Sequence, residues 1–143
     1  MSCVVFDIGG TKTRVATSTD LQKFDEVTSY KTPPTFKAGM QQLTETIDGL
    51  TNEVNAIAGG IRGMLNEEKT GIDNDAKLTK WAGESLVGAL VDKYGDIPMF
   101  LENDAAIAAV GEAVFGAGEG LPIVAYHTVS TGVGGAKIED GDI

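Results

Sequence analysis

The chain has 143 residues, of which 42% are apolar and 22% are charged, the composition of a globular protein with its own core. Its 11 basic and 21 acidic residues give a formal charge of −10, the wrong sign for binding nucleic-acid phosphates or anionic lipid, so we expect neither nucleic acid nor membrane as a partner. Cys3 stands alone, which excludes an internal disulfide and a zinc cluster built on cysteines.

The first part of the chain predicts three strands. Apolar or strand-like residues run over 3–6, 14–16 and 27–30. Gly9 and Gly10 stand between the first two runs, where the backbone must turn. We therefore expect a buried first strand, a glycine turn and a returning strand. No basic region followed by a long apolar stretch opens the chain, so we expect a cytoplasmic protein.

The middle of the chain predicts alternating helices and strands. From Phe36 to just before Asn55, apolar residues recur every three or four positions, the period of an amphipathic helix. Further along, the patterns predict a strand over 56–58, a polar loop with short strands over 62–80, a helix over 85–94 and a strand over 97–101.

The last part predicts a helix over 105–115, a glycine-rich hinge over 116–120 and a strand over 123–129 that returns after a second glycine turn. The whole order indicates an α/β fold, a mixed sheet flanked by helices. A hairpin with no layer to pack on is an unusual end for a domain, because an isolated hairpin is marginal in water.

A candidate phosphate site follows the first strand. Asp7 ends that strand, and Gly9, Gly10, Thr11 and Lys12 follow it. Glycines let several backbone N–H groups face one anion, and the threonine and lysine add a hydroxyl donor and a positive charge. The spacing matches neither a Walker A loop nor the dinucleotide fingerprint. From the residues alone, a phosphate cradle and an ordinary hairpin turn are equally good interpretations.

A second turn repeats this pattern after the strand over 123–129, with Thr131, Gly132 and Gly134. Alone, it is slightly better interpreted as a tight hairpin. Two such turns in one chain favour a nucleoside triphosphate held between them. Mg²⁺ and backbone dipoles would carry the electrostatics, which reconciles phosphate binding with the net negative charge.

Asn103 and Asp104 lie between the two turns, at the end of a predicted strand, the usual edge for ligands in open α/β sheets. A carboxylate in the first turn of a helix stays ionised, which suits a general base that takes a proton from a hydroxyl. Asn103 could hydrogen-bond a polyol. The alternative is that either residue is only a helix N-cap. Trp81 and His127 are expected to pack in the interior.

The three motifs resemble, in the same order, those of the ROK family, the group of repressors, open reading frames and sugar kinases that includes bacterial glucokinases. Residues 7–12 resemble its first phosphate motif and residues 130–135 its second. The longest match runs from Leu78 to Glu112, and essentially the whole chain is covered. The resemblance implies an actin-like ATPase fold of the ribonuclease H type, MgATP as phosphoryl donor and a hexose or amino-hexose as acceptor.

Position by position, the resemblance implies that Asp104 is the catalytic base and that Asn103, Asp104 and Gly63 bind the sugar. It implies that the ATP phosphates and Mg²⁺ are surrounded by Asp7, Gly9, Gly10, Thr11, Lys12, Thr131, Gly132 and Gly134, with Asp7 holding the Mg²⁺ through water. The chain departs from the family pattern at the proline-rich sugar loop, at a second asparagine and at the first glycine of the second phosphate motif, where it has residues 60–65, Ala106 and Ser130.

Family members are much longer, and their second lobe supplies the adenosine pocket, further sugar ligands and a zinc motif. We therefore interpret residues 1–120 as the N-terminal lobe and residues 121–143 as the first strand and hairpin of a second, absent lobe. We expect that lobe or a second copy of the chain as a partner. A noncatalytic sugar- or nucleotide-sensing module of the same fold is the alternative, whereas the acidic charge disfavours a DNA-binding repressor.

Overall fold

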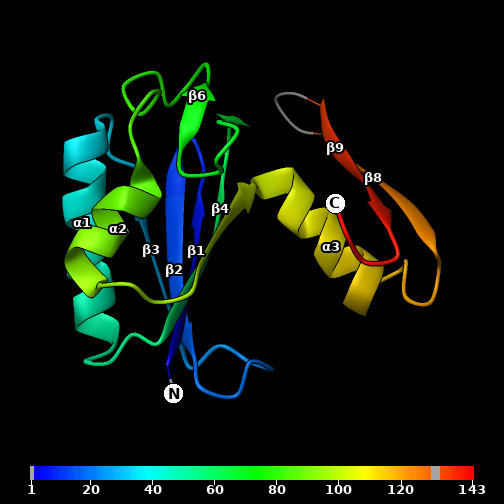
Figure 1. The fold of residues 1–143 in the computed structure, drawn as a ribbon, viewed down its shortest axis with the longest axis horizontal. Coiled ribbons are helices and arrows are strands. Elements are labelled where there is room, and N and C mark those ends of the chain that lie inside the picture. Colours follow the sequence, from blue (N-terminus) through cyan, green and yellow to red (C-terminus); the bar gives the residue numbers. More distant parts are fainter. Residues whose placement is uncertain (1, 130–132) are drawn as a thin grey trace. The chain divides into compact units, whose positions relative to one another are not determined.

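Two compact units make up the chain, Met1–Glu102 and Asn103–Ile143. Figure 1 shows them in a computed structural model, which describes residues 2–129 and 133–143. Thr131 and Gly132, two of the predicted phosphate ligands, lie outside the described residues.

The first unit is built on a five-stranded mixed sheet. Its strands, in spatial order, are β3 (Glu26–Lys31), β2 (Lys12–Ser18), β1 (Cys3–Ile8), β4 (Ala56–Ile61) and β7 (Met99–Asn103). The central strand β1 runs antiparallel to β2 and parallel to β4. Side chains alternate along it, so that Val4, Phe6 and Ile8 are buried while the residues between them are half-buried.

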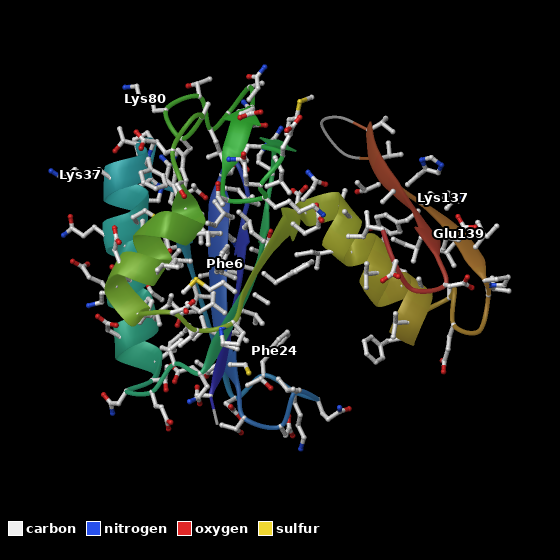
Figure 2. All side chains as sticks on the ribbon, in the orientation of Figure 1. Phe6, Phe24, Lys37, Lys80, Lys137 and Glu139 are labelled. Carbon is white, nitrogen blue, oxygen red and sulfur yellow. The ribbon has the colours of Figure 1, made fainter. Side chains whose placement is uncertain are left out.

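Two helices cover one face of this sheet (Figure 1). They are α1 (Phe36–Leu50) and α2 (Leu86–Tyr94). The hydroxyls of Thr35 and Ser85 cap them by accepting hydrogen bonds from backbone N–H groups in their first turns. The helices bury Met40, Leu43, Ile47, Leu86 and Leu90 against the sheet. Lys37 lies on the outer side of α1 (Figure 2), as the amphipathic period predicts.

The indole of Trp81 closes this core near the start of α1. It is 2% exposed, meets the ring of Phe36 edge-on at 5.6 Å, and donates from Nε1 to the carbonyl of Pro33 over 3.1 Å. The expectation that Trp81 packs in the interior is confirmed. Gly39 lets the indole of Trp81 approach the backbone of α1, because a Cβ built on Gly39 would lie 2.0 Å from an indole carbon.

The polar stretch between β4 and α2 folds as expected, as a loop with two short strands. These are β5 (Met64–Leu65) and β6 (Ile72–Asn74), which pair antiparallel. Asn66 closes the turn between them, since its side-chain oxygen accepts from the N–H of Thr70 over 2.8 Å. The turn brings Lys69 to the buried carboxylate of Glu102, with which it forms an ion pair.

The second unit packs a helix against a hairpin. Helix α3 (Asp104–Phe115) contacts both β8 (Ile123–Val129) and β9 (Val133–Glu139), which pair antiparallel. Lys137 and Glu139 form an ion pair on β9 (Figure 2). The expectation for His127 is wrong: the residue is exposed, because alternation along β8 turns it away from α3.

The predicted class, a mixed α/β sheet flanked by helices, is therefore confirmed. Every predicted strand and helix is present among the described residues, with ends that differ by a few positions. The assignment of residues 121–143 to a second lobe stays a prediction. Among residues 2–129 and 133–143, none of the helices is long and apolar enough to pass through a bilayer.

Candidate functional site

The first group of predicted site residues meets at one edge of the five-stranded sheet. Strands β1 and β4 run parallel with Ile8 opposite Ile61, so both chains leave the sheet at the same edge. Residues 9–12 follow β1 there, and Arg62 and Gly63 follow β4. The N–H of Arg62 donates to the carbonyl of Ile8 over 3.0 Å, which ties the two exits together.

Asp7 lies beside this edge, and its carboxylate is 44% exposed. Its Oδ2 accepts from Nη1 of Arg14 over 2.7 Å, across the β1–β2 ladder. Mg²⁺ usually keeps several of its waters and needs only one or two protein carboxylates besides the phosphates it binds. A single accessible carboxylate next to a candidate phosphate turn fits that requirement, so Asp7 is suited to hold Mg²⁺ through water.

The glycine turn itself is tight. Gly9 donates its N–H to the carbonyl of Lys12 over 3.0 Å, and a Cβ built on Gly9 would lie 3.0 Å from that oxygen. A Cβ on Gly10 would lie 2.8 Å from Cβ of Lys77 and 3.1 Å from Cδ of Arg62. A side chain at either position would be crowded, most of all at Gly10, against which two basic residues pack.

Asp75 holds Arg62 in this position. Its Oδ2 accepts from Nε of Arg62 over 2.8 Å, and its Oδ1 accepts from the N–H groups of Lys77 and Leu78 over 2.7 Å each. Burial alone would raise the pKa of Asp75, but the two N–H groups and the guanidinium outweigh it and hold the pKa below its ordinary value. Asp75 therefore stays ionised and fixes the loop that follows β6.

Gly63 occupies a backbone conformation that glycine adopts readily and other residues do not, with φ of +114°. A Cβ there would also lie 3.0 Å from both the carbonyl oxygen of Asn74 and Cβ of Asp75. The residue is thus needed for the shape of the predicted sugar loop, whatever it binds.

The second group of site residues begins α3. Asn103 is its N-cap: its Oδ1 accepts from the N–H groups of Ala105 over 3.0 Å and Ala106 over 3.3 Å. Asp104 is half-buried in the first turn, and its Oδ1 accepts from the N–H of Ala105 over 2.8 Å. The arrangement can position an acceptor for a hydroxyl proton.

Gly134, the described residue of the second predicted phosphate turn, lies near the same helix end. Gly134 lies on β9, and a Cβ built there would lie 3.4 Å from Cβ of Ala105 and 3.2 Å from Cγ2 of Thr128. Within the second unit, the strand that leaves this turn therefore passes beside the residue that follows Asp104. The structure brings Asn103, Asp104 and Gly134 together, and Asp7, residues 9–12 and Gly63 together, each group within its own unit.

Sequence reasoning missed the residues that support the first group. Asp75 sits in a segment predicted only as a polar loop, and Lys77 gave no signal of its own. The Asp75-x-Lys77-Leu78 order, an acidic side chain ahead of two N–H groups, is a local turn pattern that could have indicated the carboxylate's role.

The chain is similar in sequence and in fold to known proteins. A model of the ROK family matches residues 3–143, so the chain belongs to the ROK family. Its structural neighbours are ROK sugar kinases, and its fold is that of the actin-like ATPases. A glucokinase from Streptomyces griseus, solved in complex with glucose and AMPPNP, superposes with a TM-score of 0.85 at 28% identity; the match covers 99% of this chain and 46% of that one.

Sequence relatives agree with this assignment. A glucokinase of Streptomyces coelicolor is 31% identical over 134 residues, which cover 92% of this chain and 42% of that protein. An N-acetylmannosamine kinase of Citrobacter koseri is 33% identical over 146 residues, covering 99% and 49%. A xylose repressor of Bacillus subtilis is 37% identical over 68 residues, covering 44% and 17%. The chain thus spans about half the length of the curated kinases it matches.

Proposed function

We propose that this chain forms the N-terminal half of a kinase that transfers the γ-phosphoryl group of ATP to a hydroxyl of a hexose or an amino-hexose. The observation that carries the proposal is the start of α3, where Asp104 and its capping neighbour Asn103 lie next to the strand from the second glycine turn. The glucokinase and N-acetylmannosamine kinase relatives support the choice of sugars.

In this proposal Asp104 is the general base. Its carboxylate takes the proton of the sugar hydroxyl as that oxygen bonds to the γ-phosphorus, while the bond between the γ-phosphorus and the oxygen of departing ADP breaks. Asn103 has Oδ1 committed to the helix cap, which fixes the side chain in a single orientation beside the base. Gly63 shapes the loop that would face the sugar.

The glycine turns would bind the phosphates. Residues 9–12 offer backbone N–H groups, the Thr11 hydroxyl and the Lys12 ammonium, and Thr131, Gly132 and Gly134 would do the same on the second turn. Bound Mg²⁺ would neutralise charge on the phosphates, and Asp7 would hold it through water. Phosphoryl transfer is mainly a matter of positioning and charge stabilisation, so these residues need no covalent role.

Sugar-dependent ADP release tests the proposal. It is measured with MgATP and a panel of hexoses and amino-hexoses, for the 143-residue chain and for a fusion of it to the second half of the Streptomyces coelicolor glucokinase. We expect Asp104→Asn to abolish the release in whichever protein is active, while the matched exposed change Asp92→Asn leaves it unchanged. Full turnover by folded Asp104→Asn would refute the assignment of the base.

The xylose repressor relative favours a second candidate, a noncatalytic module that senses a sugar or a nucleotide. On β8 and β9, Val129 and Val133 are 78% and 75% exposed, which offers an apolar surface to a second lobe or a second copy. This candidate would be favoured over the kinase if the 143-residue chain and the fusion both bound sugar, neither released ADP, and light scattering showed that the chain self-associates.

A further inference from the structure

We infer that Thr32 is a positioning residue for the first phosphate turn, acting through the carbonyl groups of Gly9 and Thr11 rather than by contact with the nucleotide. The inference rests on the proposed function, because the turn is taken to bind the phosphates of ATP. Thr32 lies just after β3, more than twenty positions away from Gly9 in the chain, and it is 7% exposed.

Thr32 holds the turn at two points. Its hydroxyl donates to the carbonyl of Gly9 over 2.8 Å, and its N–H donates to the carbonyl of Thr11 over 3.0 Å. One residue thus fixes the peptide groups on both sides of Gly10 and Thr11, the tip of the turn.

The third hydrogen bond of Thr32 extends this support into the core. Its Oγ1 lies 2.9 Å from Oγ1 of Thr13, which is 2% exposed. A hydroxyl has one proton, and that of Thr32 goes to Gly9, so Thr13 must be the donor of this bond. The result is a buried relay from Thr13 through Thr32 to Gly9, in which each hydrogen bond strengthens the next.

The planarity of the peptide bond connects this support to ligand binding. In a trans peptide group the C=O and the following N–H point in opposite directions. Because the carbonyls of Gly9 and Thr11 are held toward Thr32, the N–H groups of Gly10 and Lys12 point away from it. Preorganised N–H groups bind an anion more tightly than ones that must first be turned toward it.

Two basic side chains pack beside Gly10, which is consistent with an anion that binds at this turn. The side-chain carbons of Lys77 and Arg62 are the nearest atoms to a Cβ built on Gly10. Thr32 itself contributes no charge and is buried, so its effect on a nucleotide would be entirely through the geometry of the turn.

The test compares Thr32→Val, which keeps the shape but removes the hydroxyl, with Thr32→Ser, which keeps the hydroxyl. Thr28→Val, on the preceding strand β3, controls for the loss of a threonine elsewhere. Amide hydrogen exchange in the 143-residue chain is followed at Gly9, bonded within the turn, and at Ile57, bonded to Pro98 across the sheet. AMPPNP binding is titrated with the same changes made in the fusion to the second half of the Streptomyces coelicolor glucokinase, which supplies the missing lobe.

We expect Thr32→Val to speed exchange at Gly9 about tenfold, the effect of losing one or two buried hydrogen bonds, while Ile57 is unchanged. AMPPNP should bind it about tenfold more weakly. Thr32→Ser and Thr28→Val should resemble the wild type in both measurements.

Equal acceleration at Gly9 and Ile57 would show only a general loss of stability and overturn the inference. So would a locally loosened turn that binds AMPPNP as tightly as the wild type does. If the folded wild-type fusion binds no AMPPNP at all, the proposed function fails instead, and the exchange comparison in the 143-residue chain still decides whether Thr32 holds the turn.

Discussion

Removal of the Asp75 carboxylate should destabilise the first unit, because this side chain joins the loop after β6 to the edge that carries the glycine turn. Its side chain is 6% exposed, and its two oxygens accept three hydrogen bonds, two from N–H groups and one from Arg62. The N–H of Leu78 belongs to a buried residue and loses its acceptor when the carboxylate is removed.

A hydrogen bond to a charged group contributes about 1.5–3 kcal/mol, but these three are not additive, since the exposed partners regain water. We expect Asp75→Ala to lower the free energy of unfolding by about 3 kcal/mol. Asp75→Asn keeps an oxygen for the two N–H groups and loses mainly the attraction to the half-exposed guanidinium, so about 1 kcal/mol is expected.

Urea unfolding followed by circular dichroism measures both changes, with the slope against urea unchanged if the unfolded states are alike. The neighbouring Asp73 is exposed, which makes Asp73→Ala the matched control. An Asp75→Ala protein as stable as Asp73→Ala would refute the reasoning, because it would mean that the three contacts contribute nothing net to the folded state.

The pH dependence of the same variants has a definite sign. The pKa of Asp75 is lower in the folded chain than its ordinary value of 3.8. The stability that the ionised Asp75 carboxylate contributes is therefore fully present above pH 3.8. It is lost as the pH falls through the lower pKa of the folded chain. The stability difference between wild type and Asp75→Asn should shrink below about pH 4 and stay constant above about pH 5.

Three further outcomes are expected. Asp104→Asn should leave the thermal midpoint within a few degrees of the wild type while abolishing sugar-dependent ADP release, since one oxygen remains to accept from the helix N–H. Gly39→Ala should cost at least about 2 kcal/mol in urea unfolding, because its Cβ would lie 2.0 Å from an indole carbon, whereas Gly49→Ala on the same helix meets nothing within 4 Å and should stabilise slightly. Lys69→Met should lower the free energy of unfolding more than Glu102→Gln does, because the buried carboxylate of Glu102 keeps its charge and loses the attraction of this cation; equal costs would contradict this.

Most of the fold could be predicted because its signals are local. The apolar period of α1, the run over β1 and the glycines at its end each lie within about fifteen residues of sequence. The failure at His127 has a physical cause as well. An apolar strand predicts a buried side chain only where both of its faces are covered, and among the described residues β8 has α3 on one face alone.

The site could be predicted only in part, because its supports are long-range. Asp104 and the glycine turn follow from motifs, since each is a short run of chemically distinctive residues. The contact of Thr32 with Gly9 joins residues far apart in the chain, and that of Arg62 with Asp75 spans a loop. Nothing in the composition of either segment specifies these pairings. The first arises from the register of β1, β2 and β3, and the second from the pairing of β5 with β6.

The net charge of the whole chain does not determine the electrostatic potential at one small site. A formal charge of −10 argues against any polyanionic partner that covers a large surface. A phosphate group is small, and the electrostatics that matter lie within a Debye length of about 8 Å. Around Gly10, the nearest side chains are those of Lys77 and of Arg62, which is paired with Asp75, and Lys12 ends the turn. An acidic chain can therefore present a local site for a phosphate.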